Sequence, residues 1–197
     1  ETNNQPTKEQ KKIKTNIVKK YFPFVWDIIK VFIIASVIVL PIRYFLFQPF
    51  IVNGESMIPN FQPGNYLIID EISYRFKNPE RGDVIVFKYP KDTSQKFIKR
   101  IIGLPGEIVE IKDGKVTIYK DNKSQTLDEK YLLDPSGTIE TVKLTLNADE
   151  YFVLGDNREF SYDSRVWGSV GIKNIIGKVF LRVLPVAVLS KITAPNY

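Results

Sequence analysis

The sequence contains no cysteine and no histidine, and these two absences exclude several kinds of active site. Without cysteine the chain has no disulfide framework, no thiol nucleophile and no Cys/His zinc site. Without histidine it cannot build a Ser-His-Asp triad. If the protein is a hydrolase, its general base must therefore be a lysine, a carboxylate or a metal-bound water.

Acidic residues are scarce near the N-terminus. Residues 1–30 carry seven lysines against Glu1, Glu9 and Asp27, a charge of +4, which leaves +2 of the net +6 for the rest of the chain. A basic tail can bind nucleic acid. Here it leads directly into a hydrophobic segment, and no stripe of arginines with interleaved aromatic residues follows. We therefore expect membrane lipids, and no nucleic acid, as its partner.

Long apolar runs are also rare, and the strongest one lies in residues 24–47. Its last twenty residues, from Ile28, would reach roughly 30 Å as a helix, which matches the hydrocarbon core of a bilayer. Lys30 and Arg43 lie near the ends, where long side chains can extend to the headgroups. We expect a transmembrane anchor here, preceded by a basic arm at 1–23; a buried or interfacial helix is the alternative.

The lysines before this segment predict its orientation. By the positive-inside rule the N-terminus lies in the cytoplasm and residues 48–197 lie on the extracytoplasmic side of the cell membrane. A cleaved secretory signal is less consistent with the sequence, because Phe-Gln-Pro-Phe follows the apolar run in place of a small-x-small processing site. The protein is therefore expected to cross the plasma membrane once.

From residue 48 onward, short apolar or alternating runs are separated by turn residues, which is typical of strands. Asp113-Gly114 predicts a type I′ hairpin turn. Residues 121–137 are expected to form a loop within a small excursion around 107–154. The predicted fold class is mainly β, a coiled antiparallel sheet at 48–197 after one N-terminal helix. Strands are expected near 49–53, 65–70, 83–89, 96–102, 107–112, 115–120, 138–145, 150–154 and 176–182.

One serine lies in a setting that suits a nucleophile. The stretch Gly54-Glu55-Ser56-Met57-Ile58-Pro59 places Ser56 on a tight turn between two apolar runs. Serine beside glycine is also ordinary turn chemistry, so this turn alone proves little. Its interpretation depends on a partner that can remove the hydroxyl proton.

Lysine can remove that proton only when it is neutral. Its ordinary pKa is about 10.4, and lowering it to 7 takes roughly 4.6 kcal/mol, which burial in an apolar pocket can supply. Lys99 lies in the apolar run Phe-Ile-Lys-Arg-Ile-Ile, and strand alternation places it on the same face as Phe97 and Ile101. The alternative is an exposed lysine on an edge strand.

A third stretch could hold such a lysine in place. Residues 155–165, Gly-Asp-Asn-Arg-Glu-Phe-Ser-Tyr-Asp-Ser-Arg, follow an apolar strand and are dense in hydrogen-bonding groups. Ser161 could orient the amine, and Asp163 with Arg165 could form an ion pair that stiffens the loop. A surface turn with an incidental ion pair is the alternative.

Four ordered motifs resemble the conserved boxes of type I signal peptidases. Together with the preceding anchor, the resemblance covers about residues 24–187. The motifs are Gly54-x-Ser56-Met57-x-Pro59, Gly82-Asp83-Val-Ile-Val-Phe87, Lys99-Arg100-Ile-Ile-Gly103-Leu104-Pro105-Gly106 and Gly155-Asp156-Asn157-Arg158-x-x-Ser161-x-Asp163-Ser164-Arg165.

The resemblance implies a membrane-bound serine endopeptidase, without cofactor or metal, that removes signal peptides ending in small residues from secreted preproteins. By matching position, Ser56 is the nucleophile, Lys99 the general base and Ser161 the orienting hydroxyl, with Asp163 and Arg165 as supports. The backbone N–H of Ser56 would donate to the oxyanion. The matching positions that would line the substrate pocket are Val52, Gly54, Met57, Phe61, Leu67 and Ile98.

Some positions depart from the pattern of the family. Gly54 stands where some members carry a serine that adds an oxyanion donor, Asn60 where threonine is usual, and Phe97 where some relatives have tyrosine. The span from Glu107 to Leu154 is short and argues against a large second-domain insertion. Two other interpretations stay open: another membrane-anchored Ser/Lys processing protease, and a non-catalytic anchored β-domain used for binding.

Overall fold

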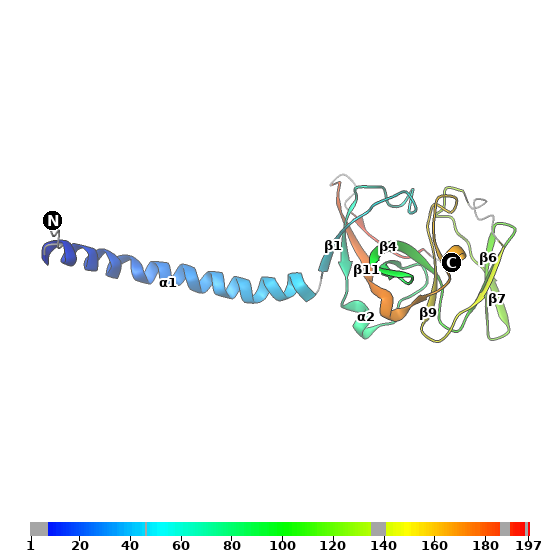
Figure 1. The fold of residues 1–197 in the computed structure, drawn as a ribbon, viewed down its shortest axis with the longest axis horizontal. Helices are drawn as coiled ribbons and strands as arrows, with labels where there is room; N and C mark the ends of the chain where they lie inside the picture. Colours follow the sequence, from blue (N-terminus) through cyan, green and yellow to red (C-terminus); the bar gives the residue numbers. More distant parts are fainter. Residues whose placement is uncertain (1–7, 46, 135–140, 186–189, 196) are drawn as a thin grey trace. The chain divides into compact units, whose positions relative to one another are not determined.

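The computed structural model describes residues 8–45, 47–134, 141–185, 190–195 and 197, and the chain divides into two compact units, Glu1–Tyr44 and Phe45–Tyr197. The first unit is one long helix, α1 (Lys8–Phe45) (Figure 1). Its segment Phe22–Leu40 is long and apolar enough to cross a membrane, with a mean hydropathy of 2.2. The predicted apolar N-terminal helix is therefore present.

The ends of α1 differ from the expected anchor at 24–47. The helix begins at Lys8, within the arm expected at 1–23, because lysine, glutamate and glutamine are good helix formers. It ends at Phe45, and Phe47 already belongs to the first strand. Composition marks the apolar part of a helix better than its ends.

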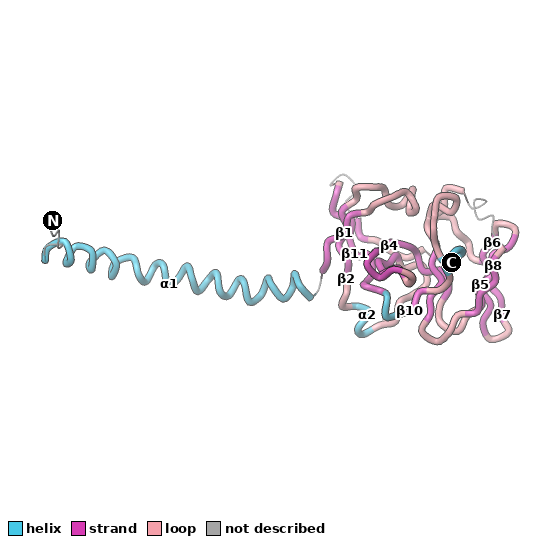
Figure 2. The backbone as a smooth tube through the Cα atoms, in the orientation of Figure 1, coloured by secondary structure: helices cyan, strands magenta, loops and turns pink. Residues whose placement is uncertain are grey.

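The second unit consists mainly of antiparallel strands, which confirms the predicted fold class (Figure 2). Its large sheet has the order β1-β2-β11-β3-β4-β9-β10, and β12 pairs with β11. The strands are β1 (Phe47–Ile51), β2 (Tyr66–Asp70), β3 (Val84–Tyr89), β4 (Asp92–Gly103), β9 (Glu150–Leu154), β10 (Val170–Gly171), β11 (Ile175–Leu184) and β12 (Ser190–Lys191).

A smaller sheet of order β7-β6-β5-β8 is inserted between β4 and β9. Its strands are β5 (Ile108–Lys112), β6 (Lys115–Lys120), β7 (Lys123–Thr126) and β8 (Val142–Thr145). The expected hairpin joins β5 to β6, with positive φ angles at Asp113 and Gly114. Helix is scarce in the described part of this unit: α2 (Ser73–Phe76), α3 (Ser164–Trp167) and the 3-10 turn η2 (Ile172–Asn174).

The central strands of the large sheet are buried on both faces. Val84 and Val86 of β3 point into one apolar cluster, whereas Ile85 and Phe87 point into another. In β9, Phe152 belongs to a third cluster shared with the small sheet. Burial on both faces explains why these strands are continuous apolar runs in the sequence.

One loop prediction and one strand prediction were wrong in extent. Part of 121–137, expected as a loop, forms β7, which pairs with β6 across a turn with positive φ at Asp121 and Asn122. All four residues of β7 are exposed and polar, so no apolar pattern marks the strand. The strand β4 likewise begins at Asp92 with five exposed residues, before the expected start at 96. Residues 138–140 of the strand expected at 138–145 lie outside the described residues.

Candidate active site

Ser56 lies on the loop between β1 and β2. Backbone hydrogen bonds close this loop at its base, from Val52 N to Asn65 O at 3.0 Å, and within it, from Ile58 N to Glu55 O at 3.1 Å. Gly54 has a φ of +85°, in the left-handed region that favours glycine, and so permits the turn just before Ser56. The expected tight turn is present, and Ser56 is half-buried on it.

Lys99 reaches this loop from β4. Its side chain is buried, only 4% exposed, and its Nζ donates to Ser56 Oγ at 2.7 Å and to the carbonyl of Ile98 at 3.0 Å. The Nζ also lies 5.7 Å from the centre of the Phe97 ring, on the face that strand alternation predicts. Ser56 and Lys99, which are 43 positions apart in the sequence, are thus in hydrogen-bond contact.

Burial lowers the pKa of Lys99 from 10.5 to about 8. Loss of water around the ammonium is the main cause; the carboxylates of Asp163 and Asp156 raise the pKa and partly offset this effect, and Arg165 lowers it further. About one amine in ten is then neutral at pH 7 and about half at pH 8. A neutral amine beside a hydroxyl is able to accept its proton.

The loop after β9 is docked onto the serine turn. Asn157 donates from its backbone N–H to Ser56 O at 3.0 Å and from its side chain to Glu55 O at 3.1 Å. A Cβ added at Gly155 would lie 2.1 Å from Ser161 Oγ and 2.5 Å from Ser56 O. Only glycine permits this close approach.

The three expected support residues lie together in this loop. Asp163 is fully buried, accepts from Gly155 N at 3.0 Å and pairs with Arg165 Nε at 2.8 Å, so the expected ion pair is present. Arg165 also donates to the carbonyl oxygens of Arg158 and Ser161. Ser161 Oγ is buried and has no hydrogen-bond partner among the described residues. Its expected bond to the lysine is therefore not formed in this structure.

The residues expected to line a substrate pocket are gathered in one place, but inside the protein. Five of them are at most 4% exposed and pack in a single apolar cluster against the Ser56 loop, whereas Gly54 is exposed at the surface. These five side chains therefore lie behind the site, within the core. The five are Val52, Met57, Phe61, Leu67 and Ile98.

Sequence reasoning missed a buried ion pair next to the lysine. Arg100 donates to both carboxylate oxygens of Asp156, at 2.8 and 2.6 Å, and Asn60 of the serine loop donates to the same carboxylate at 2.9 Å. This network joins β4, the loop after β9 and the serine loop. A signal was present, because Arg100 and Asp156 both belong to the predicted motifs, but no role was assigned to either.

In a second buried pair, only one member, Arg158, belongs to a predicted motif. Glu129 accepts from Arg158 at 2.9 and 2.6 Å, and Tyr131 donates to Glu129 at 2.7 Å. Arg158 also donates to the carbonyl of Gly155 at 3.0 Å. Glu129 lies in a stretch expected to be a plain loop, so only the fold shows that this segment returns to support the site.

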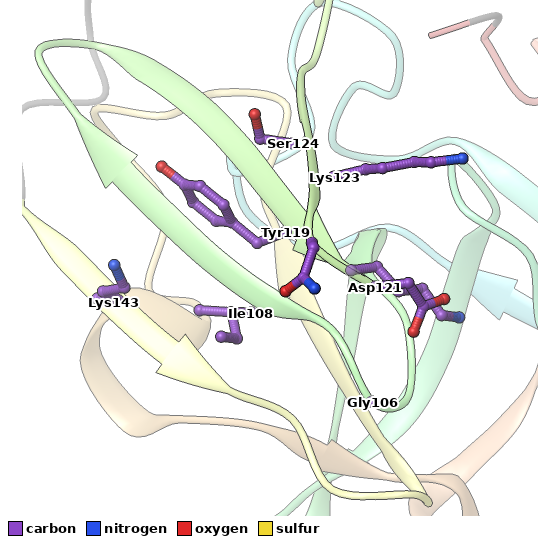
Figure 3. Close-up of a pocket in the computed structure, with 9 residues that line it drawn as sticks. Gly106, Ile108, Tyr119, Asp121, Lys123, Ser124 and Lys143 are labelled. Carbon is purple, nitrogen blue, oxygen red and sulfur yellow. The ribbon is translucent and has the colours of Figure 1, made fainter.

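A cavity of about 560 Å³ lies over the small sheet and is lined by neither Ser56 nor Lys99 (Figure 3). No group of three or more metal-binding side chains occurs in the described part of the chain.

The protein-family model described as "Signal peptidase, peptidase S26" matches residues 25–184. The chain belongs to this signal peptidase family. It is 37% identical to a probable signal peptidase I-1 of Synechocystis sp., over 83% of this chain and 86% of the relative. It is 39% identical to the signal peptidase I of Leptolyngbya laminosa, over 85% and 83% respectively. A crystal structure of a signal peptidase I from Enterococcus faecalis is 36% identical, with a TM-score of 0.46, and matches 52% of this chain and 97% of that one.

Membership in this family confirms the predicted activity. The protein is a signal peptidase I, a serine endopeptidase that cleaves signal peptides from preproteins and is anchored in a membrane by one N-terminal helix. The resemblance found in the four sequence motifs is therefore borne out, and the family favours signal peptidase over both alternative interpretations.

Proposed function

We propose that Ser56 and Lys99 form the catalytic dyad of this signal peptidase. The observation that carries the proposal is the 2.7 Å contact between Ser56 Oγ and a buried amine whose pKa is lowered to about 8. As Ser56 Oγ attacks the scissile carbonyl, neutral Lys99 takes its proton, and the ammonium then protonates the leaving amine. Water, deprotonated by the same lysine, hydrolyses the ester that remains on Ser56.

The surrounding residues have supporting roles in this proposal. The Ser56 backbone N–H donates to the oxyanion of the tetrahedral intermediate. Asp163 and Arg165 hold the loop after β9 against the serine turn. Ser161 is the orienting hydroxyl, and its buried Oγ, which lacks a hydrogen-bond partner in the described structure, is available to accept from the lysine amine.

The substrate is proposed to bind as an added strand. An extended preprotein segment would pair with residues 50–54 and 96–99, so that main-chain hydrogen bonds supply affinity. Small residues before the cleavage site fit a surface backed by a densely packed core, because the side chains behind it leave little depth. Val52, Met57, Phe61, Leu67 and Ile98 would then limit the size of the accepted side chains, and Gly54 leaves the approach open.

Orientation and domain roles complete the proposal. A basic arm at 1–23 lies in the cytoplasm, the segment 24–47 crosses the plasma membrane, and residues 48–197 act on the extracytoplasmic side, where preproteins emerge. Its partners are preproteins and membrane lipids; neither nucleic acid nor a cofactor has a part in the reaction.

Removing either member of the dyad tests the proposal. Ser56→Ala and Lys99→Ala should each abolish cleavage of a preprotein in detergent, with losses of at least about 10²-fold, while circular dichroism shows an unchanged fold. Thr93→Ala, an exposed change in β4, is the control and should cleave normally. Turnover retained in either dyad variant would remove these assignments.

A further inference from the structure

A second cavity, of about 410 Å³, lies at the end of the large sheet where β1 begins. Side chains from several segments line it, and three of them are lysines. Lys88 comes from β3, Lys96 from β4 and Lys173 from η2, while Gln48 of β1, Glu71 and Asn174 contribute polar groups. Neither residue of the proposed dyad takes part in it.

The three lysines are not explained by the fold. Lys88 and Lys96 are directly opposite each other on neighbouring strands, where like charges are destabilising. Both are exposed, and so is Lys173. Among the described carboxylates, none lies within ion-pair distance of these three ammonium groups. A bound anion would relieve this repulsion.

Glu71 adds a second unexplained group to the same cavity. Its Oε1 atom is buried and lacks a hydrogen-bond partner in the described part of the structure. Burial raises the pKa of this carboxyl, and the charges of Arg75 and Lys96 only partly oppose the effect. A buried acceptor without a donor is unfavourable, so a ligand that fits the cavity should bring a hydrogen-bond donor to Glu71.

The lining therefore describes a ligand with an anionic group and a neighbouring hydroxyl. Three lysines against one carboxylate give a local charge of about +2, which selects a net anion. Gln48 follows Leu40, the last residue of the candidate membrane span, by eight residues, so the connecting chain is at most roughly 28 Å long. A membrane surface presents anionic lipid headgroups within that reach, and basic segments bind them.

We propose that this cavity binds the glycerophosphate headgroup of an anionic phospholipid. Lys88, Lys96 and Lys173 hold the phosphate, and Glu71 accepts a hydrogen bond from a glycerol hydroxyl. The proposal rests on the membrane anchoring of the protein, but not on the Ser/Lys dyad. It adds a lipid site within the β unit to the anchor helix.

The cavity over the small sheet is a natural control. It also contains three lysines, Lys120, Lys123 and Lys143, but Lys143 is paired with Glu110 at 3.0 Å. Figure 3 shows Lys123 and Lys143 on opposite sides of Tyr119, so their charges do not converge. Replacing these three lysines changes the net charge by the same amount without touching the proposed site.

The experiment measures binding of radiolabelled phosphatidylglycerol to the full chain in neutral detergent. Wild type and Ser56→Ala should bind it saturably and alike, which separates this test from the proposed catalysis. The triple variant Lys88→Ala, Lys96→Ala, Lys173→Ala should lose at least tenfold in affinity, since each lysine near an anionic headgroup is worth about fivefold. The control triple Lys120→Ala, Lys123→Ala, Lys143→Ala should stay within about twofold of wild type.

Competition identifies the ligand. Glycerol 3-phosphate should displace the lipid better than inorganic phosphate does, and Glu71→Met should abolish that preference. Replacing all three lysines by arginine should retain binding. Equal losses in the two alanine triples, or no saturable binding by wild type, would overturn the site; inorganic phosphate competing as well as glycerol 3-phosphate would overturn the headgroup assignment.

Discussion

The ammonium group of Lys99 is buried beside Phe97, and the carboxylates of Asp163 and Asp156 offset only part of its lost hydration. The same burial that makes the amine a usable base therefore opposes folding while the amine is charged. Catalytic groups commonly have this conflict between activity and stability. Lys99 shows this conflict, and the size of its destabilising effect follows from the shift in its pKa.

Replacing Lys99 by methionine should stabilise the protein at neutral pH. The folded-state pKa of about 8 lies below the unfolded value of 10.5, so the charged lysine destabilises the fold by about 3 kcal/mol at pH 7. Wild-type stability should rise between about pH 8 and 10.5, where only the unfolded chain retains the proton. Denaturant unfolding in detergent measures the difference, which should shrink across that window; an equal difference at pH 7 and pH 10 would contradict the account.

At the scale of single residues, the sequence predicted the candidate residues of the site better than the contacts between them. Ser56 and Lys99 could be paired because the absence of histidine left few candidate bases and because Lys99 lies in an apolar strand. The rotamer of Ser161 and the burial of the pocket residues could not be predicted, since both depend on packing between distant segments. The ion pair between Asp163 and Arg165 could be predicted because two positions separate its members.

Loops, more than strands, set the geometry of the site. The backbone of Gly155 lies so close to Ser161 and to Ser56 O that any side chain there would overlap both. Gly155→Ala should push the loop after β9 off the serine turn and lower kcat by at least about 10²-fold, because small displacements in an active site have effects of that size.

Gly171→Ala is the matched control for this prediction. An added Cβ at Gly171 would have its nearest neighbour at 3.6 Å, an ordinary contact. Preprotein cleavage by this variant should stay near the wild-type rate. If Gly155→Ala cleaved as fast as Gly171→Ala, docking of the two loops would not matter for catalysis.

The returning segment after β7 is held by a buried ion pair. Glu129→Ala would remove one member of the buried ion pair with Arg158, a loss that typically costs about 3–5 kcal/mol. Asp128→Ala removes the neighbouring exposed pair with Lys130 and should change stability by less than about 1 kcal/mol. Denaturant unfolding of both variants checks the contrast, and similar losses in the two would contradict a supporting role for Glu129.

At the scale of elements, burial decided which strands could be predicted. Strands buried on one or both faces, such as β3, β9 and the second half of β4, leave apolar runs in the sequence. The polar strand β7 leaves none, because its ladder is held by backbone hydrogen bonds and its side chains face water. The small sheet could be anticipated from the Asp113-Gly114 turn, but its polar strand β7 could not.

At the scale of the whole molecule, the proposed topology places the basic arm at 1–23 and residues 48–197 on different sides of the membrane. The absence of cysteine permits a direct test by single-cysteine labelling. Lys130→Cys, at an exposed position of the β unit, should react with a membrane-impermeant maleimide in intact cells. Lys12→Cys should react only after the membrane is opened. The reverse pattern would invert the proposed orientation.

The account depends most on a lysine that loses its proton near neutral pH inside the folded protein. The most direct measurement is the pH dependence of kcat/KM for preprotein cleavage by the full chain between pH 6 and 10. We predict that kcat/KM rises with an apparent pKa of about 8 and then levels off, as Lys99 becomes neutral. A flat profile, or a rise centred near 10.5, would contradict the role of Lys99 as the base.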